Sequence, residues 1–392
     1  MVCGEALPQS FLFRADNMPA FAQGLSDTLE EAKKDKVTLT LKRCRKCGLA
    51  QLDCSPVDYY RDVIRAVGVS ETMRELRRKD YTELIEKYGL AGKKWIEVGC
   101  GNGDLLKVLA EFPVKIYGTE NNRDNANLAE HKLDGNAVIF NMFTGTEDTV
   151  IPDAPFDCFM SFNFLEHQPD PVVMLKCIRN NLADDGYGII TVPSFEYILD
   201  EKHYYELIRD HIASYTEEAL KYLCEECGFR VLESGRIGIG DTLRVVVQKK
   251  AGCNAKPAAP SQTAEENTVL NDNYRQTEKQ IEKYVNGLKE NGKTLALWGA
   301  GHQGFTLAAT TKLGEYAECF VDSSQMKHGK YAPASGLRII SPDTFFKSPA
   351  DVIMITAPGY VKEIRKAIEE RLRNIEGCSV ETVSIFDILK EE

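Results

Sequence analysis

Short, strongly apolar runs alternate with amphipathic stretches through the middle of the chain. The runs carry few polar residues, which is typical of strands that are buried on both faces of a parallel sheet. An amphipathic stretch at 171–182, between the fourth and fifth runs, predicts a helix. This alternation indicates an open parallel α/β sheet whose ligand binds at the carboxyl ends of the strands. The five runs are 95–98, 114–120, 137–141, 156–162 and 188–194.

Helices and antiparallel strands are expected on either side of these runs. A helix is predicted at 76–90 and another at 217–227, where Thr216 suits the N-cap position. The stretches 228–232 and 243–247 have the pattern of antiparallel strands that close the sheet.

The last third of the chain repeats the α/β pattern. Residues 251–267 are rich in proline, alanine and polar residues and predict a linker after an α/β domain at 76–250. An apolar stripe at 266–290 predicts a long helix. Residues 268–392 are therefore expected to form a second, Rossmann-like domain. Its predicted strands are 294–298, 318–322 and 352–356.

Composition narrows the class of protein. The chain has 59 Asp and Glu against 48 Lys and Arg, a net charge of −11, so no basic field for nucleic acid is expected. No apolar run approaches the ~18 residues of a membrane span, and no signal peptide opens the chain. The 12 cysteines are scattered, which favours reduced thiols and a cytoplasmic protein.

The first apolar run leads into a turn with glycine at Gly99, Gly101 and Gly103. Such a turn lets a ligand lie directly on the backbone. The acid at the end of the strand, Glu97, would repel a pyrophosphate but attract the cation of an amino acid, which favours S-adenosylmethionine (SAM) over a dinucleotide. Glu120 ends the second run, 17 residues after Gly103, at the spacing of a carboxylate that takes both ribose hydroxyls.

Cysteines mark the first 75 residues, which are expected to form a small separate domain. Cys44 and Cys47 form a Cys-x-x-Cys-Gly arm of the zinc-knuckle type. Cys3 and Cys54 are the candidates for the other two ligands. Four thiolates would leave no open position, so the zinc would be structural. The alternative is a scaffold of this type that has lost its metal.

A segment after the fifth run carries candidate acid–base chemistry. His211 follows Asp210, and a carboxylate beside an imidazole can tune its basicity. Tyr215, in the same segment, is a third catalytic candidate. The alternative for the histidine is a structural role in satisfying loop carbonyls.

The C-terminal domain has a glycine turn of its own, at Gly299 and Gly301, that opens a helix. A turn of this kind can hold a phosphate on free N–H groups. Asp322 ends the next strand and is placed to bind a sugar hydroxyl. The alternative is a duplicate that serves only packing.

The motifs at 97–103, Glu120 and 164–167, with Pro-Asp-Pro at 169–171, resemble the successive motifs of class I SAM-dependent methyltransferases. The resemblance implies that the glycine turn passes under the methionine moiety and that Glu120 holds the ribose. It also implies that His167 braces its loop. Further residues implied at the cofactor are Asn141 and Met142 at the adenine, and Phe162 and Asn163 on the methionine side.

Nearly the whole chain resembles the bacterial sugar C-methyltransferases that act on nucleotide-linked keto-deoxysugars. The implied architecture is a zinc-knuckle-like head, a Rossmann-like class I methyltransferase core and a Rossmann-like tail. In that family a His base removes the proton α to the ketone, the enolate attacks the SAM methyl, and the tail helps to bind the nucleotide-sugar. His211 matches the family histidine, and Asp210 stands where the family has glutamate.

The chain departs from the family pattern at three positions. Ile208 and Arg65 stand where the family has tyrosine, and Arg209 stands where it has histidine. Two phenols that would steady an enolate are therefore missing. The residues expected at the substrate are Arg209, Gly299, Gly301, His302, Asp322 and Lys327.

Two other functions stay open. Arginines at 65 and 209 suit a phosphate or carboxylate acceptor, which favours an O- or N-methyltransferase acting on a small polar metabolite. A SAM-binding scaffold or regulator without turnover is the third. The sequence leaves the acceptor, the methylated position and the oligomeric state open.

Overall fold

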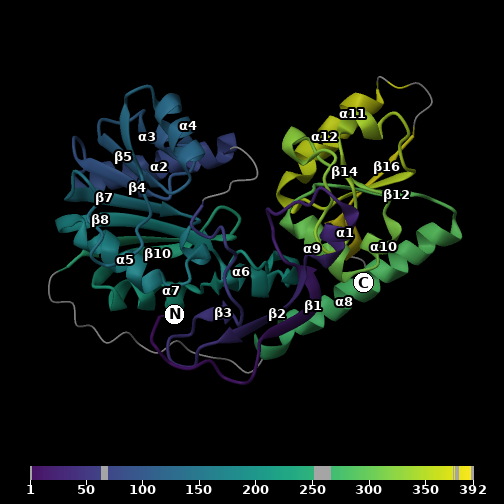
Figure 1. Cartoon of the computed structure of the whole chain (residues 1–392), viewed down its shortest axis with the longest axis horizontal. Helices are drawn as coiled ribbons and strands as arrows, with labels where there is room; N and C mark the ends of the chain where they lie inside the picture. The colour runs from purple at the N-terminus through teal and green to yellow at the C-terminus, as the bar shows by residue number, and fades with distance from the viewer. Residues whose placement is uncertain (1, 63–68, 251–265, 374, 376–378, 390–392) are drawn as a thin grey trace. The chain divides into compact units, whose positions relative to one another are not determined.

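The computed structural model describes residues 2–62, 69–250, 266–373, 375 and 379–389 (Figure 1). Arg65 and most of the predicted linker lie outside these ranges. The chain forms two compact units, which are described separately below. The first unit consists of Met1–Ser10, Lys42–Glu201 and His211–Thr263. The second unit consists of Phe11–Leu41, Lys202–Asp210 and Ala264–Glu392.

The first unit is built on a seven-stranded sheet with the order β10-β11-β8-β7-β4-β5-β6. Strands β4 to β8 pair in parallel, whereas β11 pairs antiparallel with β8 and with β10. This arrangement confirms the open parallel sheet with an antiparallel closing pair. The strands are β4 Lys94–Val98, β5 Lys115–Glu120, β6 Ala137–Asn141, β7 Phe156–Phe162, β8 Leu182–Pro193, β10 Phe229–Ile237 and β11 Thr242–Lys249.

Helices cover both faces of this sheet (Figure 1). The apolar side chains of α2, α3 and α4 pack with Trp95, Met160 and other sheet residues into one core. Helix α7 starts where its sequence predicts, because the Thr216 side chain accepts the Ala219 N–H at 3.2 Å. The helices are α2 Glu71–Tyr88, α3 Asp104–Leu109, α4 Arg123–Leu133, η1 Leu165–His167, α5 Pro171–Asn180, α6 Phe195–Asp200 and α7 Glu217–Glu226.

The turn after β4 needs its glycines. Gly99, Gly101 and Gly103 have φ values of 74°, 55° and 76°, a region that side chains rarely adopt. A Cβ at Gly99 would also lie 2.9 Å from the ring of Phe164. The backbone therefore turns tightly from β4 into α3, directly beneath the loop that follows β7.

The first 75 residues do not stay together as the separate domain that the sequence predicts. The cysteine arm belongs to the first unit, where β3 (Ala50–Leu52) pairs with β9 (Ala213–Ser214). Residues 11–41 belong to the second unit, because β1 (Phe13–Pro19) packs on helices α8 and α9. In that unit β1 pairs antiparallel with β2 (Lys36–Arg43), and helix α1 (Leu29–Lys34) lies between the two strands in sequence.

The second unit has a five-stranded parallel sheet with the order β14-β13-β12-β15-β16. This confirms the second Rossmann-like domain and the long helix before it. The strands are β12 Leu295–Trp298, β13 Phe320–Val321, β14 Ile339–Ile340, β15 Val352–Ile355 and β16 Glu381–Ser384. The helices are η2 Tyr204–Glu206, α8 Glu266–Glu290, α9 His302–Thr310, α10 Leu313–Tyr316, η3 Gln325–Lys327, α11 Pro342–Phe345, η4 Pro358–Tyr360, α12 Val361–Leu372 and α13 Ile385–Leu389.

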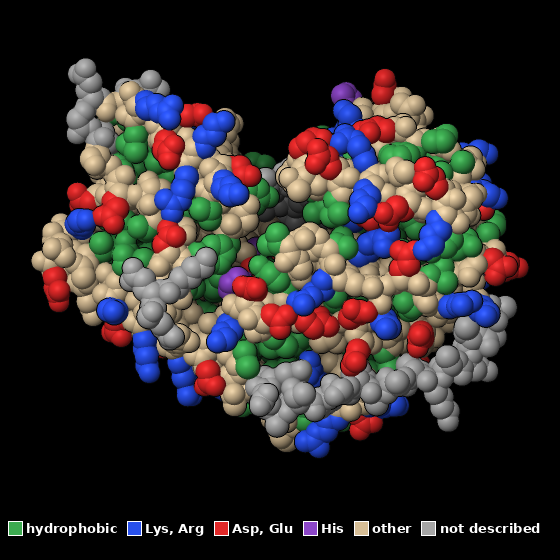
Figure 2. Space-filling view, turned by 180° about the vertical axis from the view of Figure 1, so that it is seen from behind, with side chains coloured by type: hydrophobic (Ala, Val, Ile, Leu, Met, Phe, Trp, Pro, Cys, Tyr) green, Lys and Arg blue, Asp and Glu red, His purple; other side chains and the backbone are tan. Residues whose placement is uncertain are grey.

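Acidic and basic side chains are interspersed over the face drawn in Figure 2. Among the helices in the described residues, none is both long and apolar enough to cross a membrane.

Candidate active site

Glu120 binds the glycine turn through its carboxylate. The side chain ends β5, is 1% exposed, and accepts the N–H of Gly101 on Oε2 and the N–H of Asn122 on Oε1, both at 2.8 Å. Burial raises the pKa of this carboxyl to about 7, although the backbone N–H bonds oppose the rise. Each carboxylate oxygen keeps lone-pair capacity for a further donor. The acid thus fits the ribose hydroxyls of SAM, as its position in the sequence predicts.

Glu97 lies on β4, next to this turn, and is 2% exposed. Burial raises the pKa of the Cys100 thiol well above its usual value, and the nearby charge of Glu97 raises it further. A buried acid at this place suits the ammonium group of an amino acid. Glu97, the glycine turn and Glu120 therefore form a set of groups that suits both the ammonium group and the ribose of SAM.

The other cofactor candidates lie at the carboxyl ends of neighbouring strands. The Asn141 amide donates to the backbone oxygens of Glu120 and Asn121, at 2.9 and 2.8 Å, so it ties β6 to β5. The Met142 N–H donates to the Glu120 oxygen at 3.0 Å. The structure thus brings Asn141 and Met142 together with Glu120.

On the methionine side, Phe162 is buried at the end of β7 beneath the guanidinium of Arg77, which lies 4.0 Å from the ring centroid. Asn163 follows it with a φ of 49° and accepts the Thr191 hydroxyl at 3.2 Å. Both residues stand where the chain leaves β7, between the glycine turn and the catalytic candidates.

His211 lies against His167. The two imidazole rings meet edge to face, with centroids 4.8 Å apart. The Nε2 atom of His167 is 4.0 Å from Oε1 of Glu166, and one ligand atom from each of the three residues lies within 4.8 Å of the others. Glu166 is 1% exposed, and burial raises the pKa of its carboxyl to about 8. A neutral acid and two imidazoles therefore stand together.

Sequence reasoning did not find Glu166, and it interpreted His167 as a brace. The available signal was an acid and a histidine directly after β7, because the carboxyl ends of parallel strands share one edge of the sheet.

Asp210 and Tyr215 lie in different units of the chain. Asp210 is buried in the second unit, where its Oδ2 accepts the Ala22 N–H at 2.9 Å. Tyr215 is fully buried, and burial raises the pKa of its phenol well above the usual value. Its hydroxyl has no hydrogen-bond partner within the ranges that the structure describes. The roles of both residues stay predictions.

Three of the four predicted zinc ligands meet. The sulfur atoms of Cys3, Cys44 and Cys47 lie within 4.8 Å of one another, with Cys3 and Cys44 at 3.4 Å. Burial raises the pKa of Cys47 to about 12, whereas at Cys44 backbone N–H bonds outweigh burial and lower the pKa of the thiol. The set fits three positions of a tetrahedral zinc site. Cys54 is exposed and is not part of this group.

The turn of the second unit repeats the hydrogen bonds of the first. Oδ2 of Asp322 accepts the Ala300 N–H at 2.9 Å, and Oδ1 accepts the Ser324 N–H at 2.9 Å. Lys327 donates to the Ala300 oxygen at 2.7 Å and to Asp322 Oδ2 at 3.2 Å. Gly299 has a φ of 111°, and a Cβ there would lie 2.9 Å from Ala357. Gly301, by contrast, has open space around it.

His302 and Arg209 also lie in the second unit. His302 is 3.2 Å from the Glu206 carboxylate, which Gln303 also contacts. Burial would raise the pKa of Glu206, but these partners lower it. The Arg209 guanidinium lies 5.7 Å from the centroid of the Phe21 ring. Each side chain is thus held by a neighbour in the same unit.

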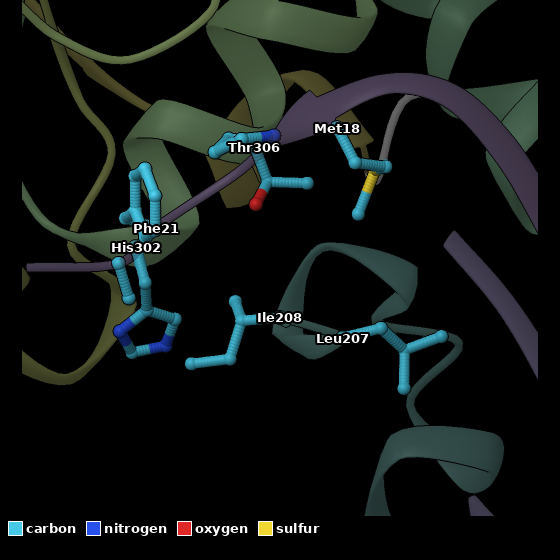
Figure 3. Close-up of a pocket in the computed structure, with 8 residues that line it drawn as sticks. Met18, Phe21, Leu207, Ile208, His302 and Thr306 are labelled. Carbon is cyan, nitrogen blue, oxygen red and sulfur yellow. The ribbon is translucent and has the colours of Figure 1, made fainter. Parts of the chain in front are cut away.

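A small apolar cavity opens beside His302 (Figure 3). Its volume is about 10 Å³, roughly the room that one water molecule needs. Ile208 lines it together with Leu207 and Met18. The cavity as it stands is too small for a sugar. The lining residues are Met18, Pro19, Phe21, Ala22, Leu207, Ile208, His302 and Thr306.

Two family descriptions match the chain. Residues 71–234 match "Methyltransferase domain", and residues 240–380 match "C-methyltransferase C-terminal domain". The first match covers the glycine turn, Glu120 and His211. It confirms the Rossmann-like methyltransferase fold and the use of SAM.

Three known proteins illustrate the similarity. The C-methyltransferase NovU of Streptomyces niveus is 26% identical over 353 residues, which is 84% of this chain and 83% of that protein. The ubiquinone biosynthesis O-methyltransferase of Haemophilus ducreyi is 30% identical over 104 residues, 25% of this chain and 44% of that protein. The crystal structure of a SAM-dependent methyltransferase from Aquifex aeolicus, 18% identical, covers 45% of this chain and 92% of its own, with a TM-score of 0.36.

Proposed function

We propose that the chain methylates a carbon atom of a nucleotide-linked keto-deoxysugar, because residues 71–234 match a methyltransferase domain and residues 240–380 match the C-terminal domain of C-methyltransferases. The contact between His211 and His167, beside a buried acid, is the observation that carries the proposal. It supplies a base where the methyl donor and a second substrate would meet.

The cofactor residues act by binding and orientation. SAM supplies a methyl group that its sulfonium activates. Glu120 holds the ribose while Gly99, Gly101 and Gly103 pass beneath the methionine moiety. Glu97 attracts the amino group, and the buried side chain of Phe162 excludes water. Asn163 follows it as an exposed residue on the methionine side. Each of these effects aligns the methyl carbon for an in-line displacement.

His211 acts as the base. Its neutral imidazole removes the proton α to the sugar ketone and becomes imidazolium, while the electron pair of the C–H bond forms an enolate. The enolate carbon then forms a bond to the methyl carbon as the bond from that carbon to sulfur breaks, which leaves S-adenosylhomocysteine. His167 and Glu166 stabilise the ring of His211 in its orientation, and a neutral Glu166 can donate a hydrogen bond without adding a charge.

The tail is proposed to hold the nucleotide end of the acceptor. Gly301, before α9, is proposed to present its backbone N–H group, whereas the Gly299 N–H already donates to the Val321 oxygen at 2.9 Å. Asp322 suits a sugar hydroxyl. Lys327 contacts this turn and suits a phosphate once its ammonium leaves Asp322. His302, at the start of α9, and Arg209 complete the proposed substrate residues.

Deuterium exchange tests the base directly. With a nucleotide-linked keto-sugar and S-adenosylhomocysteine in D₂O, the enzyme is expected to exchange the hydrogen α to the ketone. With SAM it is expected to yield a product with a new C–CH₃ group. Absence of both results across several nucleotide-keto-sugars would refute C-methylation. SAM binding without any transfer would instead favour a scaffold or regulator.

An O- or N-methyltransferase is the second candidate. The apolar surroundings of Ile208 favour it, because no phenol stands there to steady an enolate. The match to an O-methyltransferase of ubiquinone biosynthesis covers a quarter of this chain. A methyl ether or methylamine in the product would decide for this candidate.

A structural zinc ion is proposed for Cys3, Cys44 and Cys47. Three close thiols and the N–H bonds to the Cys44 sulfur support it. A reducing, cytoplasmic setting is proposed from the scattered cysteines of the sequence.

A further inference from the structure

A short segment of the first unit lies against the loops that carry the proposed SAM residues. The segment is Tyr60-Arg61-Asp62, called the strap below. It contacts residues that follow β5, β6 and β7, so it crosses the edge of the sheet where the cofactor is proposed to bind. Nothing in the family motifs points to these three side chains.

The strap reaches the ribose end through Asp62. Its Oδ1 accepts the Asn121 amide at 2.5 Å, and Asn121 directly follows the ribose acid Glu120. The two carboxylates are close enough for the charge of Asp62 to raise the pKa of Glu120, in addition to burial. Two like charges side by side disfavour each other, so this pair is costly unless hydroxyl donors lie between the acids.

The strap reaches the adenine end through its aromatic and cationic side chains. Tyr60 meets Phe143 edge to face with centroids 6.2 Å apart, and Phe143 follows Met142. The Arg61 guanidinium lies 5.4 Å from the Tyr60 ring centroid and 5.3 Å from that of Phe143, and its Nε donates to the Tyr60 hydroxyl at 3.1 Å. The three groups form one aromatic and cationic cluster, and bases commonly stack on the faces of side chains of these types.

The strap is also anchored to the glycine turn. The Gln168 amide, which is buried, donates to the backbone oxygens of Tyr60 and Phe164, at 3.5 and 3.4 Å. The ring of Phe164 in turn lies on Gly99. The position of the strap is therefore tied to the backbone on which the methionine moiety is proposed to lie.

We propose that the strap and Phe143 form the outer wall of the adenosyl end of the SAM site, with Asp62 as a second acid that accepts a ribose hydroxyl beside Glu120. The inference rests on the cofactor residues of the proposed function. A wall of this chemistry selects an unphosphorylated adenosyl group, because two adjacent carboxylates repel a phosphate on the ribose. Tyr60 and Phe143 supply apolar faces for the adenine ring.

Binding of two probe ligands shows which end of the SAM site each variant affects. SAM carries both the adenosyl group and the amino acid, whereas 5′-methylthioadenosine carries the adenosyl group without the amino acid. Titration calorimetry with both is expected to show that Asp62→Asn weakens each by about tenfold, the size of one hydrogen bond to a charged group. Phe143→Ala is expected to weaken both as well. Glu97→Gln is expected to weaken SAM alone.

Two further variants separate the possible outcomes. Asp58→Asn changes an exposed aspartate in the same stretch and is expected to bind both probes as the wild type does. Glu120→Gln tests the underlying site and is expected to weaken both. If Glu120→Gln weakens binding while Asp62→Asn and Phe143→Ala do not, the strap proposal is wrong and the cofactor site stands. If Glu120→Gln has no effect either, the proposed cofactor residues are wrong too.

Discussion

The imidazole of His211 packs edge to face on that of His167, at 76° between the ring planes. The two residues lie more than forty positions apart in sequence, but both follow strands of the same sheet edge. The contact gives a base a defined neighbour in place of solvent.

His211→Gln is expected to lower the rate of methyl transfer by about 10²–10⁴-fold, because it removes the proposed general base. SAM binding should be unchanged, since the cofactor contacts lie elsewhere. Single-turnover rates with the cognate acceptor and SAM titrations measure the two effects. His131→Gln, on the exposed last turn of α4, is the matched control and should keep full activity. Full activity in His211→Gln would exclude the base.

Glu166→Gln is expected to stabilise the protein above neutral pH. The carboxyl has a pKa of about 8 when folded against an ordinary value of 4.5, so the folded state binds the extra proton between these values. The wild type therefore loses stability as pH rises from about 4.5 to 8, by at most about 5 kcal/mol, and the amide does not.

Thermal unfolding of both proteins from pH 5 to 9 measures this difference. The gap in Tm should widen in favour of the variant as pH rises. A gap that is constant over this range would show that Glu166 titrates normally.

Cys3→Ser is expected to abolish or sharply reduce bound zinc and to lower Tm, because two thiols do not hold a structural zinc ion tightly. Metal analysis of the purified protein measures the content. Cys54→Ser is the control and should keep the metal, because Cys54 is outside the thiol cluster. Equal loss in both variants would restore Cys54 as a ligand.

Asp80→Ala is expected to cost about 3–5 kcal/mol of unfolding free energy, since it leaves buried positive charge without its partner. Asp80 accepts Arg77 at 2.7 Å and Arg244 at 2.8 Å, and Arg77 is 1% exposed. Urea denaturation measures the loss. In the control, Asp200→Ala breaks an exposed pair with Arg236 and should cost under about 1 kcal/mol. Similar losses in the two variants would contradict this prediction.

The sheets could be predicted because their strands are apolar on both faces, and the acid Glu120 because it ends such a strand. Both are local patterns. The place of residues 11–41 could not be predicted, because their partners α8 and α9 lie more than two hundred residues later. The local sequence pattern of a strand does not show whether it packs on the cysteine arm or on the C-terminal domain.

The same limit explains the misses at the candidate site. Glu166 is part of the motif at 164–167 in the sequence, and only the fold shows that its side chain is buried beside two imidazoles. Cys54 has suitable spacing for a ligand, but it is exposed and is not part of the thiol cluster. Asp210 and His211 are neighbours in sequence; the Asp210 carboxylate accepts the Ala22 N–H, and its role stays a prediction.

Lys327 has a consequence for how long a ligand stays on the tail. Its ammonium already occupies the Ala300 oxygen and Asp322, so an incoming phosphate must compete with a partner that is always present at high effective concentration. Competition of this kind shortens residence and speeds exchange of the bound molecule. If the tail holds the acceptor as proposed, rapid exchange suits an enzyme whose product differs from its substrate by one methyl group.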